Sequence, residues 1–230
     1  IGSHLIDKLI KRGEEVIGYK IGCVAKETQN KMGFTTPAWG RLWKSELHSD
    51  GVILKKVNYA NPAMEAEFGI ILKRDIEPEL VSFDYILNSI ETIHPLIEIH
   101  NLIFHGNSPL GAELLANNAI HAGFVSGGGG LPSNCFSETM FDGARLEIFL
   151  NNQLLGRCEG QLLLETICLS LKWLWHELLQ NGERLHAGQI VLTGSVPNLF
   201  SVVDECSIRV ESLPFGDVVA EVKNSTLRTC

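Results

Sequence analysis

The sequence lacks a basic excess, a long hydrophobic run and a recognisable leader. It has 19 Lys and Arg against 27 Asp and Glu, a net charge of −8, whereas proteins that bind nucleic-acid backbones or anionic membrane surfaces are usually basic. No apolar run reaches the roughly 18 residues of a membrane span, and segment 1–17 is amphipathic and charged, unlike a secretory signal peptide. These absences predict a cytoplasmic protein that binds neither nucleic acid nor membrane.

Cysteine motifs for metal binding or redox chemistry are also missing. The six cysteines are widely spaced and none forms a CxxC pair, which argues against a zinc cassette or a thioredoxin-like motif. We therefore expect reduced thiols, with Cys168 packed in the core because it lies in an apolar helical stretch. The glycine run 127–130 lacks a following GK, so it does not indicate a phosphate-binding loop.

Hydrophobic periodicity predicts many strands and few helices. It favours helices over 3–12 and 161–182 and a third that follows a loop and ends near residue 94, whereas 24–50 is interpreted as loop-rich. No linker or repeat interrupts the chain, so 1–230 is expected to form a single domain with a β-rich α+β fold. The expected strands cover 15–22, 51–59, 63–73, 95–104, 121–128, 144–157 (a hairpin turning at Asn151-Asn152), 189–195, 206–213 and 217–224.

The best chemical signal is the pair Glu65 and Glu67 in an otherwise apolar strand. Alternation puts both side chains on one face of that strand, with their Cα atoms about 6.5 to 7 Å apart, so that the two carboxylates can converge on one hard cation such as Mg²⁺. The alternative is an ordinary exposed strand face, on which alternating acids are common. Burial of the strand would favour the cation, since two unpaired buried carboxylates are costly.

Two further residues point to the same chemistry. Glu98 is the only acid in an apolar strand, and a lone buried Glu needs a metal, a lysine or a hydrogen bond. Lys20 lies between Gly18 and Gly22, which would permit close approach of a ligand; it is either an active-site group or an ordinary exposed lysine. Three carboxylates make an oxygen-only set that suits Mg²⁺ or Mn²⁺ better than Zn²⁺. The nearby His94 and His100 are interpreted as structural or loop residues.

The order of these motifs resembles a known family. GYKIG at 18–22, the ExE strand, Glu98, and GxxLxxGQIVLTGS at 182–195 follow one another as in the 2-oxo-acid hydratases and decarboxylases. These are the 2-hydroxypenta-2,4-dienoate hydratases and 4-oxalocrotonate decarboxylases of the fumarylacetoacetate hydrolase superfamily. The resemblance covers nearly the whole chain. It implies a mixed β-sheet roll like the fumarylacetoacetate hydrolase C-terminal domain, with the family's extra N-terminal helical segment absent from this sequence.

The resemblance also implies an activity. The chain would be a lyase, a hydratase or decarboxylase, in which the metal chelates a small unsaturated 2-oxo acid and stabilises its enolate. Relatives act in aromatic compound catabolism and form homo-oligomers, some with a coupled partner enzyme. The implied site consists of Glu65, Glu67 and Glu98 as ligands of Mg²⁺ or Mn²⁺, Lys20 as the active-site lysine, and the turn of Thr193, Gly194 and Ser195 around the substrate carboxylate.

Three acids of the family pattern are neutral in this sequence. The Asp of a Pro-Asp-aromatic-Gly segment is Ala38, that of an Ala-Asp-Asn-Ala segment is Asn117, and the Asp three residues after Glu98 is Asn101. Two other functions therefore stay open. One is a related superfamily activity, such as C–C bond hydrolysis or oxaloacetate decarboxylation. The other is a catalytically impaired metal-binding homologue or partner subunit.

Overall fold

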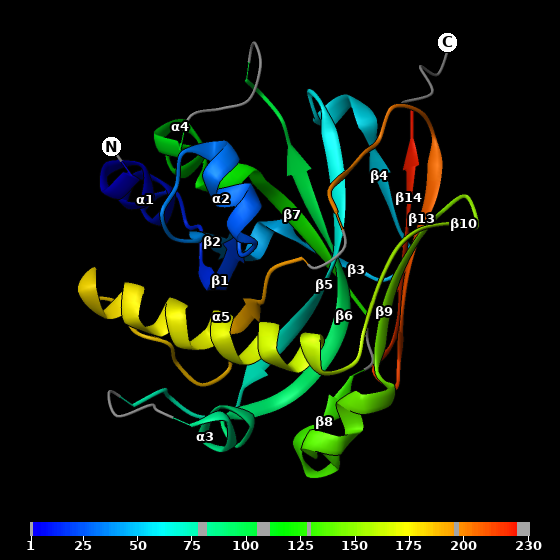
Figure 1. The fold of residues 1–230 in the computed structure, drawn as a ribbon. Coiled ribbons are helices and arrows are strands. Elements are labelled where there is room, and N and C mark those ends of the chain that lie inside the picture. Colours follow the sequence, from blue (N-terminus) through cyan, green and yellow to red (C-terminus); the bar gives the residue numbers. More distant parts are fainter. Residues whose placement is uncertain (1, 78–81, 105–110, 128–129, 196–197, 225–230) are drawn as a thin grey trace, which may run out of the picture.

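Two β-sheets form the framework of the protein (Figure 1). The computed structural model describes residues 2–77, 82–104, 111–127, 130–195 and 198–224. In the described residues the larger sheet has nine strands, with β12 (Phe200–Ser201) paired to β5 and β8 (Leu131–Pro132) paired to β6. Its main path runs β2 (Ala38–Trp43), β1 (Val16–Gly22), β11 (Ile190–Leu192), β5 (Pro62–Leu72), β6 (Ile90–Asn101), β7 (His121–Ser126) and β3 (Leu47–Ser49).

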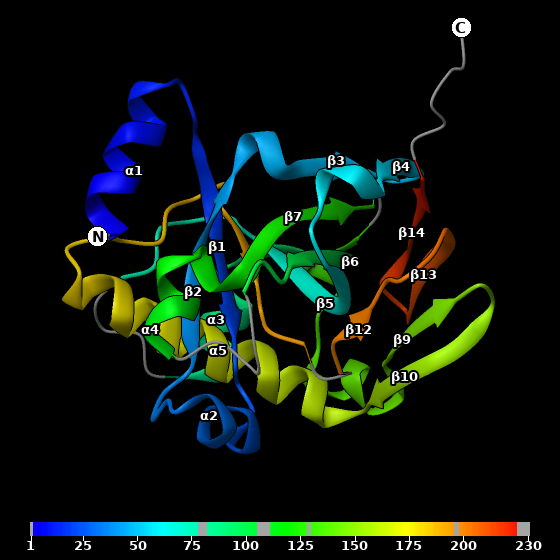
Figure 2. The same cartoon turned by 90° about the horizontal axis from the view of Figure 1, so that it is seen from above.

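The second sheet stands on the right in Figure 1, on the opposite side of the molecule from the N-terminal helix α1 (Gly2–Lys11), as Figure 2 also shows. Its five strands run β10 (Gln153–Glu159), β9 (Arg145–Leu150), β13 (Cys206–Leu213), β14 (Gly216–Lys223) and β4 (Val52–Lys55). The remaining described helices are α2 (Lys26–Met32), α3 (Phe83–Leu87), α4 (Gly111–Ala116) and α5 (Gln161–Gln180), with short 3-10 turns at Lys44–Glu46, Lys56–Asn58, Asn118–Ile120, Ser133–Cys135 and Glu138–Gly143.

The long helix α5 covers the core because its apolar residues recur every three or four positions. Leu163, Ile167, Leu171, Leu174 and Leu178 are all buried, and the same helix buries Cys168, as expected from the sequence. Cys168 is not part of a disulfide. No described helix is both long and apolar enough to cross a membrane.

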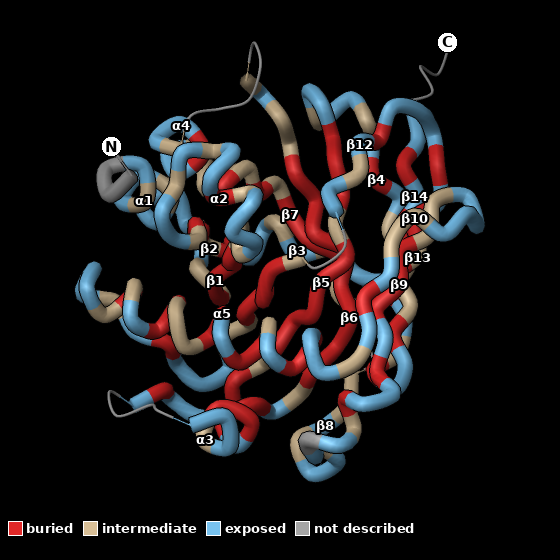
Figure 3. Tube along the Cα trace, viewed as in Figure 1, coloured by how far each residue is buried: buried red, intermediate tan, exposed pale blue. Residues whose placement is uncertain are grey.

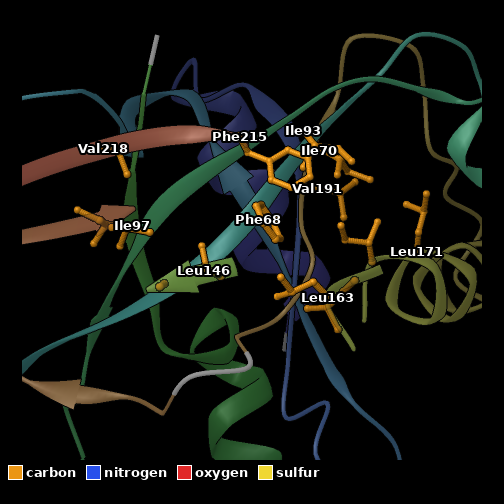
Figure 4. Packing of buried hydrophobic residues seen from close by; sticks show 14 of the residues in the cluster. Phe68, Ile70, Ile93, Ile97, Leu146, Leu163, Leu171, Val191, Phe215 and Val218 are labelled. Carbon is orange, nitrogen blue, oxygen red and sulfur yellow. The ribbon is translucent and has the colours of Figure 1, made fainter. Parts of the chain in front are cut away.

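The central strands β5 and β6 are buried almost from end to end (Figure 3). Side chains of a strand alternate between its two faces, so each strand serves two environments. On one face, Phe68 and Ile97 pack in the main core beneath α5 and the second sheet (Figure 4). The other face carries Glu67 and Glu98, which are also fully buried. Burial of both faces makes the framework around these acids rigid.

The β-rich α+β architecture predicted from the sequence is confirmed, and so is the hairpin of β9 and β10. Asn151 and Asn152 both have positive φ, +48° and +67°, the conformation that a two-residue hairpin turn of this type requires. Two local predictions are wrong. The loop-rich segment 24–50 contains α2 and strand β2, which pairs with β1. The helix expected up to residue 94 ends at Leu87, because Ile90 already starts β6 and pairs with β5.

Phe215, in the turn between β13 and β14, links the two sheets. Its ring centroid lies 4.9 Å from that of Phe68 on β5, in an edge-to-face arrangement, and both side chains are buried.

Phe215→Ala should lower the free energy of unfolding by about 3–5 kcal/mol, because it leaves a cavity between the sheets. Urea titration of the variant and the wild type measures the difference in the free energy of unfolding. Leu213→Ala, at a neighbouring side chain that is 55% exposed, should change it by less than about 0.5 kcal/mol; equal losses would contradict the packing role of Phe215.

Candidate functional site

The strand register brings the predicted carboxylates together. Glu65 on β5 lies directly opposite Glu98 on β6, and Glu67 follows two residues after Glu65 on the same face. Glu67 and Glu98 have no exposed surface, whereas Glu65 is partly exposed. The alternative of an ordinary exposed strand face is therefore wrong, because this face of the sheet is covered.

Lys20 reaches the same cluster from β1, and it is almost fully buried. Its Nζ lies 3.2 Å from Oε1 of Glu98. Burial lowers the pKa of Lys20, but the carboxylates of Glu98, Glu67 and Glu65 together raise it above the ordinary value. The lysine is therefore charged at neutral pH, and the interpretation as an ordinary exposed lysine is wrong.

Of the two glycines that flank Lys20, only Gly22 borders the cavity described below. Gly18 has a different reason to be glycine. A Cβ at that position would lie 1.8 Å from the carbonyl oxygen of Ile190 on the neighbouring strand β11. Gly18 therefore allows close packing of two strands and not the approach of a ligand.

Glu98 is held from one side. Its Oε1 accepts from Lys20 and lies 2.6 Å from Nδ1 of His121 on β7, while Oε2 has no hydrogen-bond partner among the described residues. Burial raises the pKa of Glu98, but the nearby His100 and Lys20 lower it by a larger amount, so the pKa lies well below the usual range. Glu98 is thus ionised, with one oxygen fixed and the other turned toward Glu65 and His100.

Glu67 points to the turn that follows β11. Its Oε2 accepts the backbone N–H of Gly194 at 3.0 Å, and its Oε1, although buried, has no hydrogen-bond partner in the part of the chain that is described. Burial and the negative charges of Glu98 and Glu65 raise the pKa of Glu67 well above its usual range. The positive charge of Lys20 acts in the opposite direction on the pKa of Glu67, but it does not outweigh burial and the two neighbouring acids.

His100 belongs to the cluster, which corrects its interpretation as a structural or loop residue. Its Nε2 lies 3.0 Å from Oε2 of Glu65 and 3.4 Å from Oε2 of Glu98. Burial lowers the pKa of His100, but the two carboxylates raise it to about 9. One donor atom from each of these three residues lies within 4.8 Å of the others, a spacing that can hold a metal ion. Its position two residues after Glu98, on the same strand face, was the signal in the sequence.

His94, two positions before Leu96 on the same strand, keeps its structural interpretation. Its Nε2 lies 3.0 Å from the hydroxyl oxygen of Ser126 on β7, and burial lowers its pKa to about 4. It is therefore a neutral, buried side chain outside the carboxylate cluster.

The cluster opens into a cavity of about 390 Å³. Next to the cluster its wall is charged, from Lys20, Glu65 and His100, and Ser195 adds a hydroxyl; Lys31 of α2 is a further charged lining residue. Most of the remaining wall comes from α2, α4 and the segments around them. These other lining residues are Gly22, Cys23, Val24, Ala25, Thr28, Lys31, Met32, Leu114, Ala119, Ile120, Asn198 and Leu199. A small molecule with an acidic end and a hydrocarbon part fits such a wall.

The turn Thr193-Gly194-Ser195 reaches the site with only one of its side chains. Both the backbone N–H and the hydroxyl of Thr193 donate to the carbonyl of Phe68, each at 3.1 Å. Gly194 has φ of +91°, and a Cβ there would lie 2.8 Å from the side chain of Val24, so glycine is required. Its N–H is used by Glu67. Ser195 alone lines the cavity.

Two of the three positions at which the sequence departs from the pattern of the resembled family, Ala38 and Asn101, have structural roles. Ala38 is fully buried and packs with Leu114 and Ala119 in a small apolar cluster. Asn101 accepts the backbone N–H groups of Ala60 and Asn61 with its side-chain oxygen, at 2.9 and 3.2 Å. An acid at residue 38 would thus be surrounded by apolar side chains, whereas Asn101 orders the segment before β5.

Comparison with known proteins supports the resemblance seen in the motifs, although no family model matches the chain. The chain is 27% identical over 220 residues to 2-keto-4-pentenoate hydratase 1 of Dechloromonas aromatica, covering 92% of this chain and 79% of that protein. It is 25% identical over 218 residues to a 4-oxalocrotonate decarboxylase of a Pseudomonas species, covering 93% and 81%.

Solved structures show the same fold. The 4-oxalocrotonate decarboxylase from Pseudomonas putida G7, complexed with magnesium and adipate, superposes with a TM-score of 0.84 at 20% identity, over 96% of this chain and 83% of that one. Fumarylacetoacetate hydrolase from Exiguobacterium antarcticum gives 0.65 at 13% identity, over 91% and 76%. The chain is therefore similar in sequence to 2-keto-4-pentenoate hydratases and 4-oxalocrotonate decarboxylases, and it has the fold of fumarylacetoacetate hydrolase.

Proposed function

We propose that the protein is a divalent-metal-dependent lyase, a hydratase or decarboxylase, that acts on a small unsaturated 2-oxo acid. The observation that carries this proposal is the cluster of Glu65, Glu98 and His100 at the cavity wall, with Lys20 paired to Glu98. The names of the relatives, which include both hydratases and decarboxylases, support the reaction class.

We assign the metal to Glu65, Glu67 and Glu98. Two buried carboxylate oxygens without a hydrogen-bond partner among the described residues, Oε1 of Glu67 and Oε2 of Glu98, fit a cation, because an unpaired buried charge is costly. Carboxylate oxygens are the ligands that Mg²⁺ and Mn²⁺ prefer. When bound, a divalent ion supplies Lewis-acid stabilisation for negative charge that develops on the 2-oxo oxygen of the substrate.

Lys20 holds a proton at Nζ beside this charge. Because its pKa is raised, it acts as a positive charge and proton donor at neutral pH, and it acts as a base only after it has given up its proton. The hydroxyl of Ser195, at the cavity wall, donates to the carbonyl of Ala66 at 3.2 Å, and it would bind the carboxylate end of the substrate by turning its proton from that carbonyl to the ligand. Thr193 and Gly194 fix the turn that presents it.

His121 and Glu46 form a chain of contacts that begins at Oε1 of Glu98. An ionised carboxylate only accepts hydrogen bonds, so the proton between Glu98 and His121 belongs to Nδ1. Nε2 of His121 lies 3.6 Å from Oε2 of Glu46. Burial raises the pKa of Glu46 to about 7, with further contributions from Glu14 and Glu98. Together these residues orient Glu98 so that its second oxygen remains available.

A C–C hydrolase is the second candidate, because fumarylacetoacetate hydrolase shares the fold. Turnover of an acylpyruvate in place of an unsaturated 2-oxo acid would select it. A chain that binds metal but turns over neither class of acid would be a catalytically impaired homologue.

The first prediction concerns the metal. The metal-stripped protein should bind Mg²⁺ or Mn²⁺ in a calorimetric titration and should then bind oxalate, a mimic of a chelating 2-oxo acid. Glu65→Ala and Glu98→Ala should each weaken metal binding about tenfold or more, since even loss of a residue that supports a ligand costs about that much. The matched control is Glu147→Gln, at a buried glutamate paired with Arg157 on the second sheet. A wild-type chain that binds neither ion contradicts the proposal.

The second prediction concerns Lys20. Lys20→Met should lower kcat/KM for 2-keto-4-pentenoate hydration or 4-oxalocrotonate decarboxylation by about 10²–10⁴-fold, the usual contribution of a general acid or base. Metal binding should survive, because Lys20 is not a ligand. Lys55→Met, at an exposed lysine of β4, should keep full activity. Unchanged turnover in Lys20→Met would remove the lysine from the mechanism.

The third prediction concerns pH. Because the folded-state pKa of Glu46 is about 7 and the ordinary value is near 4.3, the folded protein holds this proton more tightly than the unfolded chain. Its contribution to the free energy of unfolding therefore falls as pH rises from about 4.3 to about 7. Glu46→Gln removes that contribution, so the variant should gain stability relative to wild type between pH 5 and pH 8. Urea titrations at both pH values measure the free energy of unfolding of the variant and of the wild type. A difference between the two proteins that is the same at pH 5 and pH 8 would contradict the prediction.

A further inference from the structure

We infer that His100 is a fourth protein ligand of the metal ion, which turns an oxygen-only site into a mixed nitrogen and oxygen site that prefers Mn²⁺ and later transition ions to Mg²⁺. This inference rests on the proposed function. The inference goes beyond the proposed function because it names a ligand other than the three carboxylates and predicts the metal preference of the site.

The distances between donor atoms support direct coordination. Adjacent ligands of an octahedral ion with bonds of about 2.1 Å lie about 3 Å apart. Nε2 of His100 lies 3.0 Å from Oε2 of Glu65 and 3.4 Å from Oε2 of Glu98. An ion that binds both of these oxygens therefore has the imidazole nitrogen at ligand distance or in its way.

The setting of the donor atoms agrees with a shared cation. Oε2 of Glu98 is buried and has no hydrogen-bond partner in the described ranges. Nε2 of His100 lies 3.4 Å from this oxygen and has Oε2 of Glu65 as its hydrogen-bond partner. Lys20 and His121 both contact Oε1 of Glu98. Neither contact involves Oε2, which faces Nε2 of His100. His100 is 3% exposed, so it has no room to turn away into solvent.

The simplest alternative is a purely electrostatic role, in which a protonated His100 neutralises Glu65 and Glu98. In that arrangement Nε2 keeps its proton and stays hydrogen-bonded to a carboxylate oxygen, and the carboxylates alone would hold the metal. The two roles therefore differ in whether nitrogen touches the bound ion.

Nitrogen coordination has a consequence for selectivity. Mg²⁺ favours oxygen ligands and water, whereas imidazole suits transition ions, whose affinity rises from Mn²⁺ toward Co²⁺ and beyond. The structure places one donor atom each of Glu65, Glu98 and His100 within 4.8 Å of one another, so an ion held there would have nitrogen as well as oxygen among its ligands.

The experiment uses the full chain, stripped of metal and reloaded with Mn²⁺. Electron spin echo envelope modulation should show coupling to a directly bound ¹⁴N nucleus in the wild type. His100→Gln should lose that coupling. The matched control is His94→Gln, at a buried histidine on the same strand that contacts Ser126; this variant should retain the coupling.

Calorimetry on the same three proteins measures selectivity. Wild type and His94→Gln should bind Mn²⁺ and Co²⁺ more tightly than Mg²⁺, and His100→Gln should lose about tenfold or more of that preference while its Mg²⁺ affinity changes little. Circular dichroism checks that the variants fold.

The two proposals fail in different ways. Bound Mn²⁺ without nitrogen coupling in the wild type overturns the role of His100 and leaves the three-carboxylate site intact. This outcome needs no variant, so it holds even if His100→Gln does not fold. A wild-type chain that binds none of the ions overturns the metal site itself.

Discussion

Glu98 is a carboxylate without exposed surface, in the middle of a sheet that is covered on both faces, and the site is arranged around its charge. Leaving such a group unpaired would cost several kcal/mol or more. Lys20 from β1 and His121 from β7 compensate one oxygen, and Glu65 with His100 surround the other. Strands on both sides of β6 must therefore be in register before the acid can remain ionised.

The same strands build the core and the site. On β5, Phe68 faces the main core and meets Phe215 from the second sheet, while its neighbour Glu67 faces the opposite side and meets the turn at Gly194. Because the strand is packed on both faces, the carboxylates lie on a rigid support, which is what a site needs to hold an ion or a substrate in a fixed geometry.

Two departures from the pattern of the resembled family serve packing and backbone hydrogen bonding. Ala38 is part of an apolar cluster, and Asn101 holds backbone groups before β5. Both residues are fully used by the fold. Glu65, Glu98 and His100 lie together beside Lys20, so the ionisable groups of the candidate site are concentrated where charge is buried.

Local periodicity in the sequence determined much of the protein. The alternation around Glu65 and Glu67, the single acid at Glu98, the apolar spacing of α5 and the Asn151-Asn152 turn each specify structure within a few residues, so they could be interpreted without knowledge of the fold. Tertiary structure decided what these elements meet. Strand β2 forms only because β1 lies beside it, and segment 90–94 is a strand because it pairs with β5. His121, Glu46 and the turn at Gly194 join the site from distant segments, since strand pairing and register depend on contacts that no local pattern records.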